Sequence, residues 1–138
     1  MNIQKGIDNT VVLTLSEKST LLSPEYLIEF TSNLAGSKTS KVVALTDISD
    51  YVESYNMFVI TESNTEDLQN SIVYLSPVGK WSYIVYEMES SSPRNMNTAD
   101  AVGIVETGIC EVEGVDEVRN VFDEDETKNN GVFDEEWV

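Results

Sequence analysis

The sequence contains no histidine and only one cysteine. Histidine is the commonest general base in enzymes and the commonest ligand of transition metals, so its absence excludes Ser-His-Asp and Cys-His catalytic sites and the usual zinc sites. The single Cys110 cannot form a disulfide within the chain. Because no neighbouring residue would lower the pKa of its thiol, we interpret Cys110 as a buried apolar residue.

Phosphate-binding motifs and long apolar runs are missing as well. The seven glycines are scattered and form neither a Gly-x-Gly-x-x-Gly motif nor a Walker loop, so no nucleotide cofactor is indicated. No window approaches about 18 consecutive apolar residues, and Met1 to Gly6 lacks the apolar segment of a signal peptide. We therefore expect a soluble protein that is made in the cytoplasm and carries no cofactor.

Acidic residues are abundant, but their spacing does not indicate catalysis or metal binding. Glu87 and Glu89 lie on one face of an expected strand, an arrangement more typical of a solvated strand end than of an acid and base pair. The run from Asp123 to Glu126 lacks the spaced ligands and the distal glutamate of an EF-hand calcium site. We predict that the protein is not an enzyme and has no metal site.

Basic residues are few, and their scarcity limits the choice of partner. Eight Lys and Arg stand against 25 Asp and Glu, which gives a net charge of −17. This charge repels nucleic acid and anionic membranes, so we expect neither as a partner. A partner should instead offer basic or apolar surface.

The longest run of aromatic and β-branched residues lies between Val78 and Glu89 and predicts a central strand. Alternation places large apolar residues on both of its faces, which would both have to be covered. We expect this strand to form a hairpin with the run 72–75, because Pro77 and Gly79 supply turn residues between them. The two faces would carry, respectively, Trp81, Tyr83 and Val85, and Ile84, Tyr86 and Met88.

Shorter runs with the same alternation occur along the chain, separated by polar segments every 8 to 12 residues. No long segment has a helical period. The pattern predicts an all-β fold, an antiparallel immunoglobulin-like β-sandwich of about seven strands in residues 1–114. Gly108 interrupts the last run and indicates a turn or a bulge. The other expected strands cover residues 11–15, 26–31, 41–46, 57–61 and 102–112.

Residues 115–138 have a different composition and predict an extended acidic C-terminal tail. They hold nine acidic and two basic residues, so a net −7 of the −17 lies there. A Val-Phe-Asp-Glu pattern occurs twice. One interpretation is a solvated tail with incidental aromatic residues. The other is a partner-binding peptide whose aromatic side chains enter apolar pockets while its acids meet basic residues. The residues in question are Phe122, Phe133, Glu135, Glu136 and Trp137.

Three segments of the chain form a recognisable series: Pro24 to Ser32, the Gly-x-Trp-x-Tyr-x-x-Tyr-Glu run from Gly79 to Glu87, and Val105 to Gly108. Together they resemble a pattern found in small structural proteins of crAss-like and related phages that infect Bacteroidota. The similarity covers roughly residues 9–113 and does not include the tail. It implies a virion component in which the aromatic residues of the second segment, namely Trp81, Tyr83 and Tyr86, determine the fold. It implies no catalytic residue.

Two classes of function follow. The first is a non-enzymatic virion structural protein that decorates the head or anchors a head fibre, with a tail or neck component as the alternative position. Its partners would be capsid or fibre subunits, and a homo-oligomer is a further alternative. The protein would be made in the host cytoplasm and reside in the virion. The second is a soluble acidic binding module or inhibitor that captures a basic partner.

Overall fold

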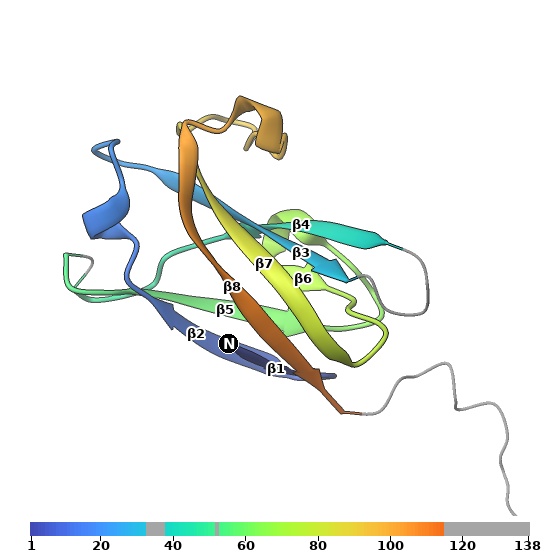
Figure 1. Cartoon of the computed structure of the whole chain (residues 1–138). Helices are drawn as coiled ribbons and strands as arrows, with labels where there is room; N and C mark the ends of the chain where they lie inside the picture. Colours follow the sequence, from blue (N-terminus) through green and yellow to red (C-terminus); the bar gives the residue numbers. More distant parts are fainter. Residues whose placement is uncertain (33–37, 52, 115–138) are drawn as a thin grey trace, which may run out of the picture.

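The computed structural model describes residues 1–32, 38–51 and 53–114. Within these ranges the chain forms eight β-strands and three single-turn 3-10 helices, and no α-helix (Figure 1). This confirms the prediction of an all-β fold. The strands are β1 (Asn2–Gln4), β2 (Asp8–Leu13), β3 (Glu25–Ser32), β4 (Thr39–Leu45), β5 (Asn56–Glu62), β6 (Ile72–Val73), β7 (Gly79–Met88) and β8 (Gly103–Glu113), and the helices are η1 (Ser16–Lys18), η3 (Leu68–Asn70) and η4 (Thr98–Asp100).

The strands form two sheets. One sheet has five strands in the order β1-β8-β7-β3-β4, and the other has three in the order β2-β5-β6. The long strands pair antiparallel, as the sequence predicts. The short strands β1 and β6 instead pair parallel, with β8 and β5 respectively. The expectation of a purely antiparallel fold is therefore wrong for these two strands.

Strand β7 occupies the middle of the larger sheet, between β3 and β8. On the face toward the smaller sheet, Trp81, Tyr83 and Val85 are buried, as their alternation predicts. The indole Nε1 of Trp81 donates a hydrogen bond to the backbone oxygen of Pro77 at 2.9 Å. A buried indole N–H needs such a partner, because leaving it unpaired in an apolar core costs free energy.

Both sheets contribute to one hydrophobic core. Tyr26 of β3 and Phe58 of β5 meet edge to face across the two sheets, with ring centroids 6.2 Å apart. Trp81, Phe30 and Phe58 are the largest fully buried side chains. Burial of this apolar surface between the sheets supplies the main favourable free energy of folding.

The opposite face of the larger sheet is covered at one end only. There Leu27, Ala44 and Met88 form a second buried cluster beneath Met96 and Ala101 of the β7–β8 connection. Farther along the same face the side chains are partly or largely exposed. The expectation that both faces of β7 are covered is thus confirmed at the Met88 end and wrong over the rest of the strand.

The expected hairpin between residues 72–75 and β7 is wrong. Strand β6 comprises only Ile72 and Val73, and it lies beside β5 in the other sheet. The buried carboxylate of Glu62 at the end of β5 accepts a hydrogen bond from the backbone N–H of Leu75 at 3.0 Å. This bond holds the segment after β6 against β5, so it cannot lie beside β7 as well.

Gly108 does not interrupt the last strand. β8 runs continuously past it, and the irregularity in the β7–β8 ladder falls between Val85 and Tyr86 instead. There the partner changes from Glu106 to Ile104, so Val105 is the extra residue of a β-bulge. Val105 nonetheless points into the core, where it is buried.

Candidate functional site

One exposed surface of the molecule is the uncovered part of the larger sheet, which we call the outer sheet face. Adjacent strands bring its side chains into rows, because residues that pair across a sheet share a face. One row joins Thr107, Ile84, Glu29 and Val42 across β8, β7, β3 and β4. The face comprises Glu29 and Thr31 of β3, Ser40 and Val42 of β4, Lys80, Ser82, Ile84 and Tyr86 of β7, and Ile104, Thr107, Ile109, Glu111 and Glu113 of β8.

The outer sheet face differs chemically from the rest of this acidic chain. Glu29 is the charged residue in its middle, and the Tyr86 hydroxyl donates a hydrogen bond to the Glu29 carboxylate at 2.9 Å. The other charged residues, Lys80, Glu111 and Glu113, lie together at the end where β7 begins. Ile104 and Ile109 are 58% and 52% exposed. Such a surface combines exposed branched apolar side chains with neutral hydroxyl groups. It can bury apolar area against another protein without leaving buried charges unpaired.

A second candidate surface is the end of the molecule formed by the connections β2–β3 (residues 14–24) and β4–β5 (residues 46–51 and 53–55), which we call the loop end. Asn56 ties the two connections together. Its side-chain oxygen accepts hydrogen bonds from the backbone N–H groups of Leu15 and Ser16 at 2.8 and 3.2 Å. Its Nδ2 donates to the Asp47 carboxylate at 2.6 Å. These bonds fix the base of the loop end.

Asp47 is held in its ionised form at this base. Partial burial raises the pKa of its carboxyl, but hydrogen bonds from the backbone N–H of Ser49, the Asn56 side chain and the backbone N–H of Met57 outweigh burial, so the pKa is lowered overall. The carboxylate therefore keeps its negative charge through the physiological range.

Glu87 anchors the β2–β3 connection from the side of the sheet. Its side chain is fully buried, and its carboxylate accepts hydrogen bonds from the backbone N–H groups of Thr20 and Leu21 at 2.9 and 2.7 Å. The Thr20 hydroxyl adds a third bond at 3.2 Å. The expectation that Glu87 belongs to a solvated strand end is therefore wrong, because this connection folds over it and supplies the donors.

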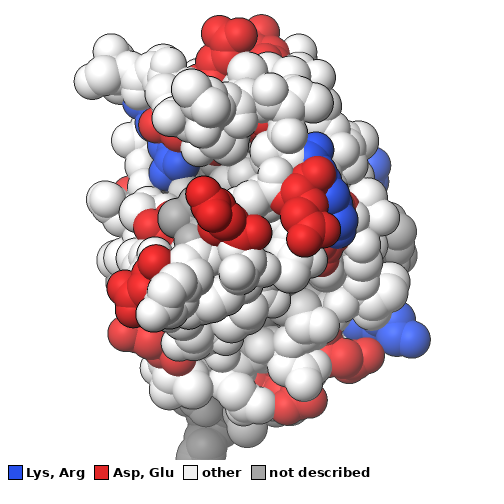
Figure 2. Space-filling view, turned by 90° about the vertical axis from the view of Figure 1, so that its left-hand side faces the viewer, with Lys and Arg blue, Asp and Glu red and all other residues white. Residues whose placement is uncertain are grey.

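Between the two connections lies a cleft of about 390 Å³. Figure 2 looks onto this side of the molecule, where acidic side chains cover more surface than basic ones. Glu53 also borders a neighbouring hollow of about 300 Å³ with Asp50 and Tyr51. The side chains that line the larger cleft include Leu21, Leu22, Pro24, Tyr26, Asp47 and Glu53.

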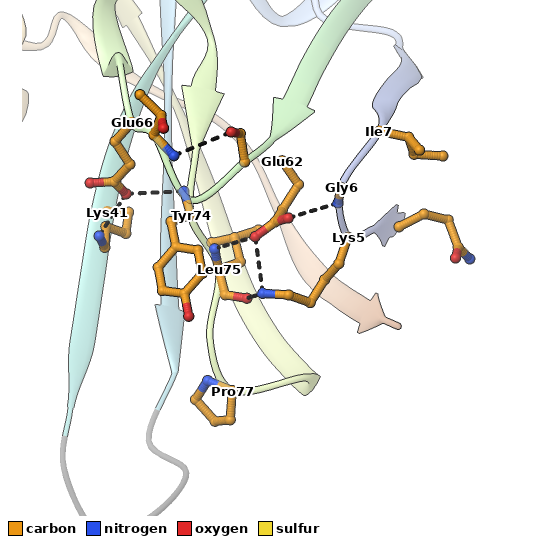
Figure 3. A network of polar contacts seen from close by, with 12 residues as sticks. Lys5, Gly6, Ile7, Lys41, Glu62, Glu66, Tyr74, Leu75 and Pro77 are labelled. Carbon is orange, nitrogen blue, oxygen red and sulfur yellow. Dashed lines mark hydrogen bonds and ion pairs between the residues drawn. The ribbon is translucent and has the colours of Figure 1, made fainter. Parts of the chain in front are cut away.

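A buried polar network joins the N-terminal segment to the β5–β6 region (Figure 3). Lys5 Nζ lies 3.0 Å from Glu62 Oε2 and donates to the Leu75 oxygen at 2.7 Å. The other Glu62 oxygen accepts the backbone N–H of Gly6 at 2.8 Å. Lys5 also lies 4.5 Å above the Tyr74 ring centroid. Because both charges are buried and both carboxylate oxygens are occupied, we interpret this network as a structural clamp.

The basic residues of the fold are largely neutralised within it. Four of the six Lys and Arg in the described ranges form ion pairs with glutamates. Most acidic residues in these ranges have no ion pair within the fold. The pairs are Lys5 with Glu62, Lys18 with Glu106, Lys41 with Glu66 and Arg94 with Glu25.

The described ranges offer little chemistry of other kinds. They contain no group of three or more His, Cys, Asp or Glu side chains placed to hold a metal ion. Cys110 is fully buried, and burial raises the pKa of its thiol to about 11, which leaves it unreactive at neutral pH. In the same ranges no helix is long and apolar enough to cross a membrane.

The partner-binding residues proposed from the sequence lie outside the described residues, which end at Gly114. The aromatic residues of the resemblance are described: Trp81 and Tyr83 are buried, whereas Tyr86 is half-buried on the outer sheet face. Sequence reasoning missed this face because Ile104 and Ile109 are five residues apart, which alternation places on opposite faces of a strand. Only the bulge at Val105 brings the two side chains to the same face. The tail residues concerned are Phe122, Phe133, Glu135, Glu136 and Trp137.

Comparison with known proteins gives no relative. No family model, no curated protein and no solved structure matches this chain. Its function therefore has to be inferred from its own residues and surfaces.

Proposed function

We propose that this chain is a non-enzymatic structural protein of a virion, which decorates the head or anchors a head fibre through protein–protein contacts. The outer sheet face carries this proposal. On a chain with a net charge of −17, this face has one charged residue in its middle, Glu29, which is already hydrogen-bonded to Tyr86, and its other charges lie at one end. Such a face is suited to contact with capsid or fibre subunits. The resemblance of Gly79 to Glu87 to small phage structural proteins supports the choice of a virion.

The energetics of the outer sheet face favour a protein partner over exposure to water. Burying apolar area yields about 25 cal/mol per Å², and the half-exposed Ile104 and Ile109 both have area left to bury. Neighbouring Thr31, Ser82 and Thr107 are hydroxyl residues that can form hydrogen bonds with a partner or with trapped water. A flat face of this kind can be buried without an unpaired charge at its centre.

The immunoglobulin-like sandwich type is part of the proposal. The order β8-β7-β3-β4 in one sheet and the pairing of β2 with β5 in the other correspond to the G-F-C-C′ and B-E arrangement of that fold. Three features depart from antibody domains. The chain has no disulfide between the sheets, and its buried tryptophan, Trp81, lies on β7 rather than on β3. Strand β6 pairs parallel with β5, whereas the sheets of that fold are antiparallel.

The acidic tail would supply a second contact with a neighbouring subunit. Phe122, Phe133 and Trp137 would bury apolar area, and acids such as Glu135 and Glu136 would meet basic residues. Exposed charges are screened beyond about 10 Å at 0.1 M salt, whereas apolar burial is not. Deleting residues 115–138 should therefore weaken incorporation into particles at low and at high salt, whereas Phe133→Ala with Trp137→Ala should mainly remove the salt-resistant part.

The outer sheet face is tested by replacing Ile104 and Ile109 with threonine, which keeps the β-branched shape and the strand propensity. We expect the double variant to fold but to enter particles in much lower copy number than the wild type. Val12→Thr is the matched control, because Val12 is 57% exposed on β2 of the other sheet. Equal incorporation of the double variant and the control would rule out the outer sheet face as the contact.

A soluble acidic module that captures a basic partner is the second candidate. The observation that favours it is the internal pairing of four of the six described basic residues, which leaves the surface strongly acidic. Such a module would be found outside particles, in complex with its basic partner. A virion protein would instead sediment with the particles.

A further inference from the structure

We infer that the loop end is a second interaction site, which binds a protein segment carrying a lysine or arginine beside a large apolar side chain. It lies at the end of the two sheets formed by the β2–β3 and β4–β5 connections, apart from the outer sheet face (Figure 1). Its cleft between these connections offers room for side chains of a partner.

Large apolar side chains are exposed on the loop end. Leu22 is fully exposed at the cleft, Tyr51 is 69% exposed beside the neighbouring hollow, and Ile48 is about half exposed between them in sequence. Isolated exposed apolar residues are ordinary, but Leu22 at the cleft, Tyr51 at the hollow and Ile48 on the same connection as Tyr51 together expose apolar area at one end of the molecule, which we call the apolar rim. An apolar side chain of a partner can pack against these residues and bury their exposed apolar surface.

The acidic residues of the loop end favour a partner with a basic side chain. Glu17, Asp47, Asp50 and Glu53 lie on these connections. The one lysine there, Lys18, is bound to Glu106 at 3.0 Å. An anionic segment, a nucleic acid or a second acidic copy of this end would be repelled, whereas a lysine or arginine would find unpaired carboxylates next to an apolar rim.

Arg94 lies near the loop end, but its guanidinium group contacts other residues and not the acids of the loop end. Its Nη2 donates to the Leu45 oxygen at 2.7 Å, and its Nε lies 3.5 Å from the Glu25 carboxylate. Within the described ranges no Lys or Arg forms an ion pair with Asp50 or Glu53. A lysine or arginine of a partner can supply the complementary charge.

The loop end is also held in shape before any partner arrives. Asn56 and Asp47 fix the base of the two connections, and the buried Glu87 carboxylate holds the backbone at Thr20 and Leu21, directly before Leu22. A site that is already ordered loses less conformational entropy on binding than a loop that must first be fixed. Recognition side chains on loops held by a rigid scaffold are a common arrangement for binding.

The test uses the purified full-length chain and a displayed library of random peptides of about twelve residues. The library is selected on the wild type, and the winning peptides are synthesised and their affinities measured. The variant Leu22→Ser with Glu53→Gln removes one apolar and one acidic side chain from the loop end. The control, Ile7→Ser with Asp8→Asn, makes the same change in charge at an exposed pair elsewhere.

We expect the winning peptides to carry Lys or Arg within two positions of Leu, Phe or Trp. They should bind the wild type and the control alike, and the loop-end variant at least about tenfold more weakly. The acidic tail is present in all three proteins, so attraction to the tail cancels. Peptides without a cation, or equal binding to all three proteins, would overturn the proposal. Unchanged melting temperatures verify that the variants fold, and the result does not depend on entry into particles.

Discussion

Tyr83 on β7 lies across Gly108 on β8, and a side-chain carbon at position 108 would be only 2.7 Å from the tyrosine hydroxyl oxygen. The ring passes over the bare backbone of Gly108, and its hydroxyl donates to Glu106 at 2.9 Å. Glu106 in turn binds Lys18 of η1 at 3.0 Å. The Tyr83 ring, packed on Gly108, thus positions its hydroxyl to bind Glu106, and Glu106 links β8 to Lys18 in the β2–β3 connection.

Gly108→Ala should destabilise the fold by about 1–3 kcal/mol, because the added methyl group overlaps the Tyr83 ring and forces it to move. Chemical denaturation measures the change in the free energy of unfolding. Gly103→Ala on the same strand is the matched control, since a Cβ there meets nothing within 4 Å. Similar losses in the two variants would show that the Tyr83 ring does not restrict position 108.

The hydroxyl of Tyr83 should lose its proton only at an unusually high pH. Burial, the hydrogen bond to Glu106 and the negative charge of Glu106 raise its pKa to about 12. The folded state thus favours the neutral phenol, so its contribution to stability is complete below about pH 10 and is lost as the pH rises toward 12. Burial also raises the pKa of Tyr26 and of Tyr86. Ultraviolet titration should therefore show a component near pH 12 that is absent in Tyr83→Phe. A full set of tyrosines titrating near 10 in the folded protein would contradict this.

Trp81→Ala should cost about 3–5 kcal/mol, the usual effect of removing a large buried aromatic side chain. The variant would lose the fully buried indole and its hydrogen bond to Pro77. Thermal and chemical denaturation both measure the loss. A variant within about 1 kcal/mol of the wild type would show that the indole is not part of the core.

Glu62→Gln should destabilise the fold by about 3–5 kcal/mol, because it leaves the buried Lys5 ammonium without its counter-charge. Glu66→Gln is the matched control, since its ion pair with Lys41 is partly exposed and such pairs contribute about 0–1 kcal/mol. The comparison uses the free energies of unfolding at neutral pH. Equal effects of the two substitutions would contradict the role of the buried network as a clamp.

The long strands could be predicted because their alternation is strong: Trp81, Tyr83 and Val85 are buried where the period of two places them. Strand β1 has three residues with one buried side chain, Ile3, which is too little pattern to recognise. β6 could not be placed, because its position depends on the contact of Glu62 with Leu75.

The candidate surfaces were harder to predict because each is assembled from distant segments. Glu87 looks like an exposed acid in sequence, and only the folded β2–β3 connection supplies the donors that bury it. The outer sheet face joins β3, β4, β7 and β8, so its low charge emerges only once the strand order is known. The loop end likewise depends on Asn56, which bonds to residues on both connections.

Quantitative mass spectrometry of particles purified on density gradients tests the proposed structural role most directly. If the chain is a virion structural protein, it should co-purify with the particles through every fraction, in many copies and at a constant ratio to the major shell protein. Its presence in the soluble fraction alone, with none in the purified particles, would contradict this role.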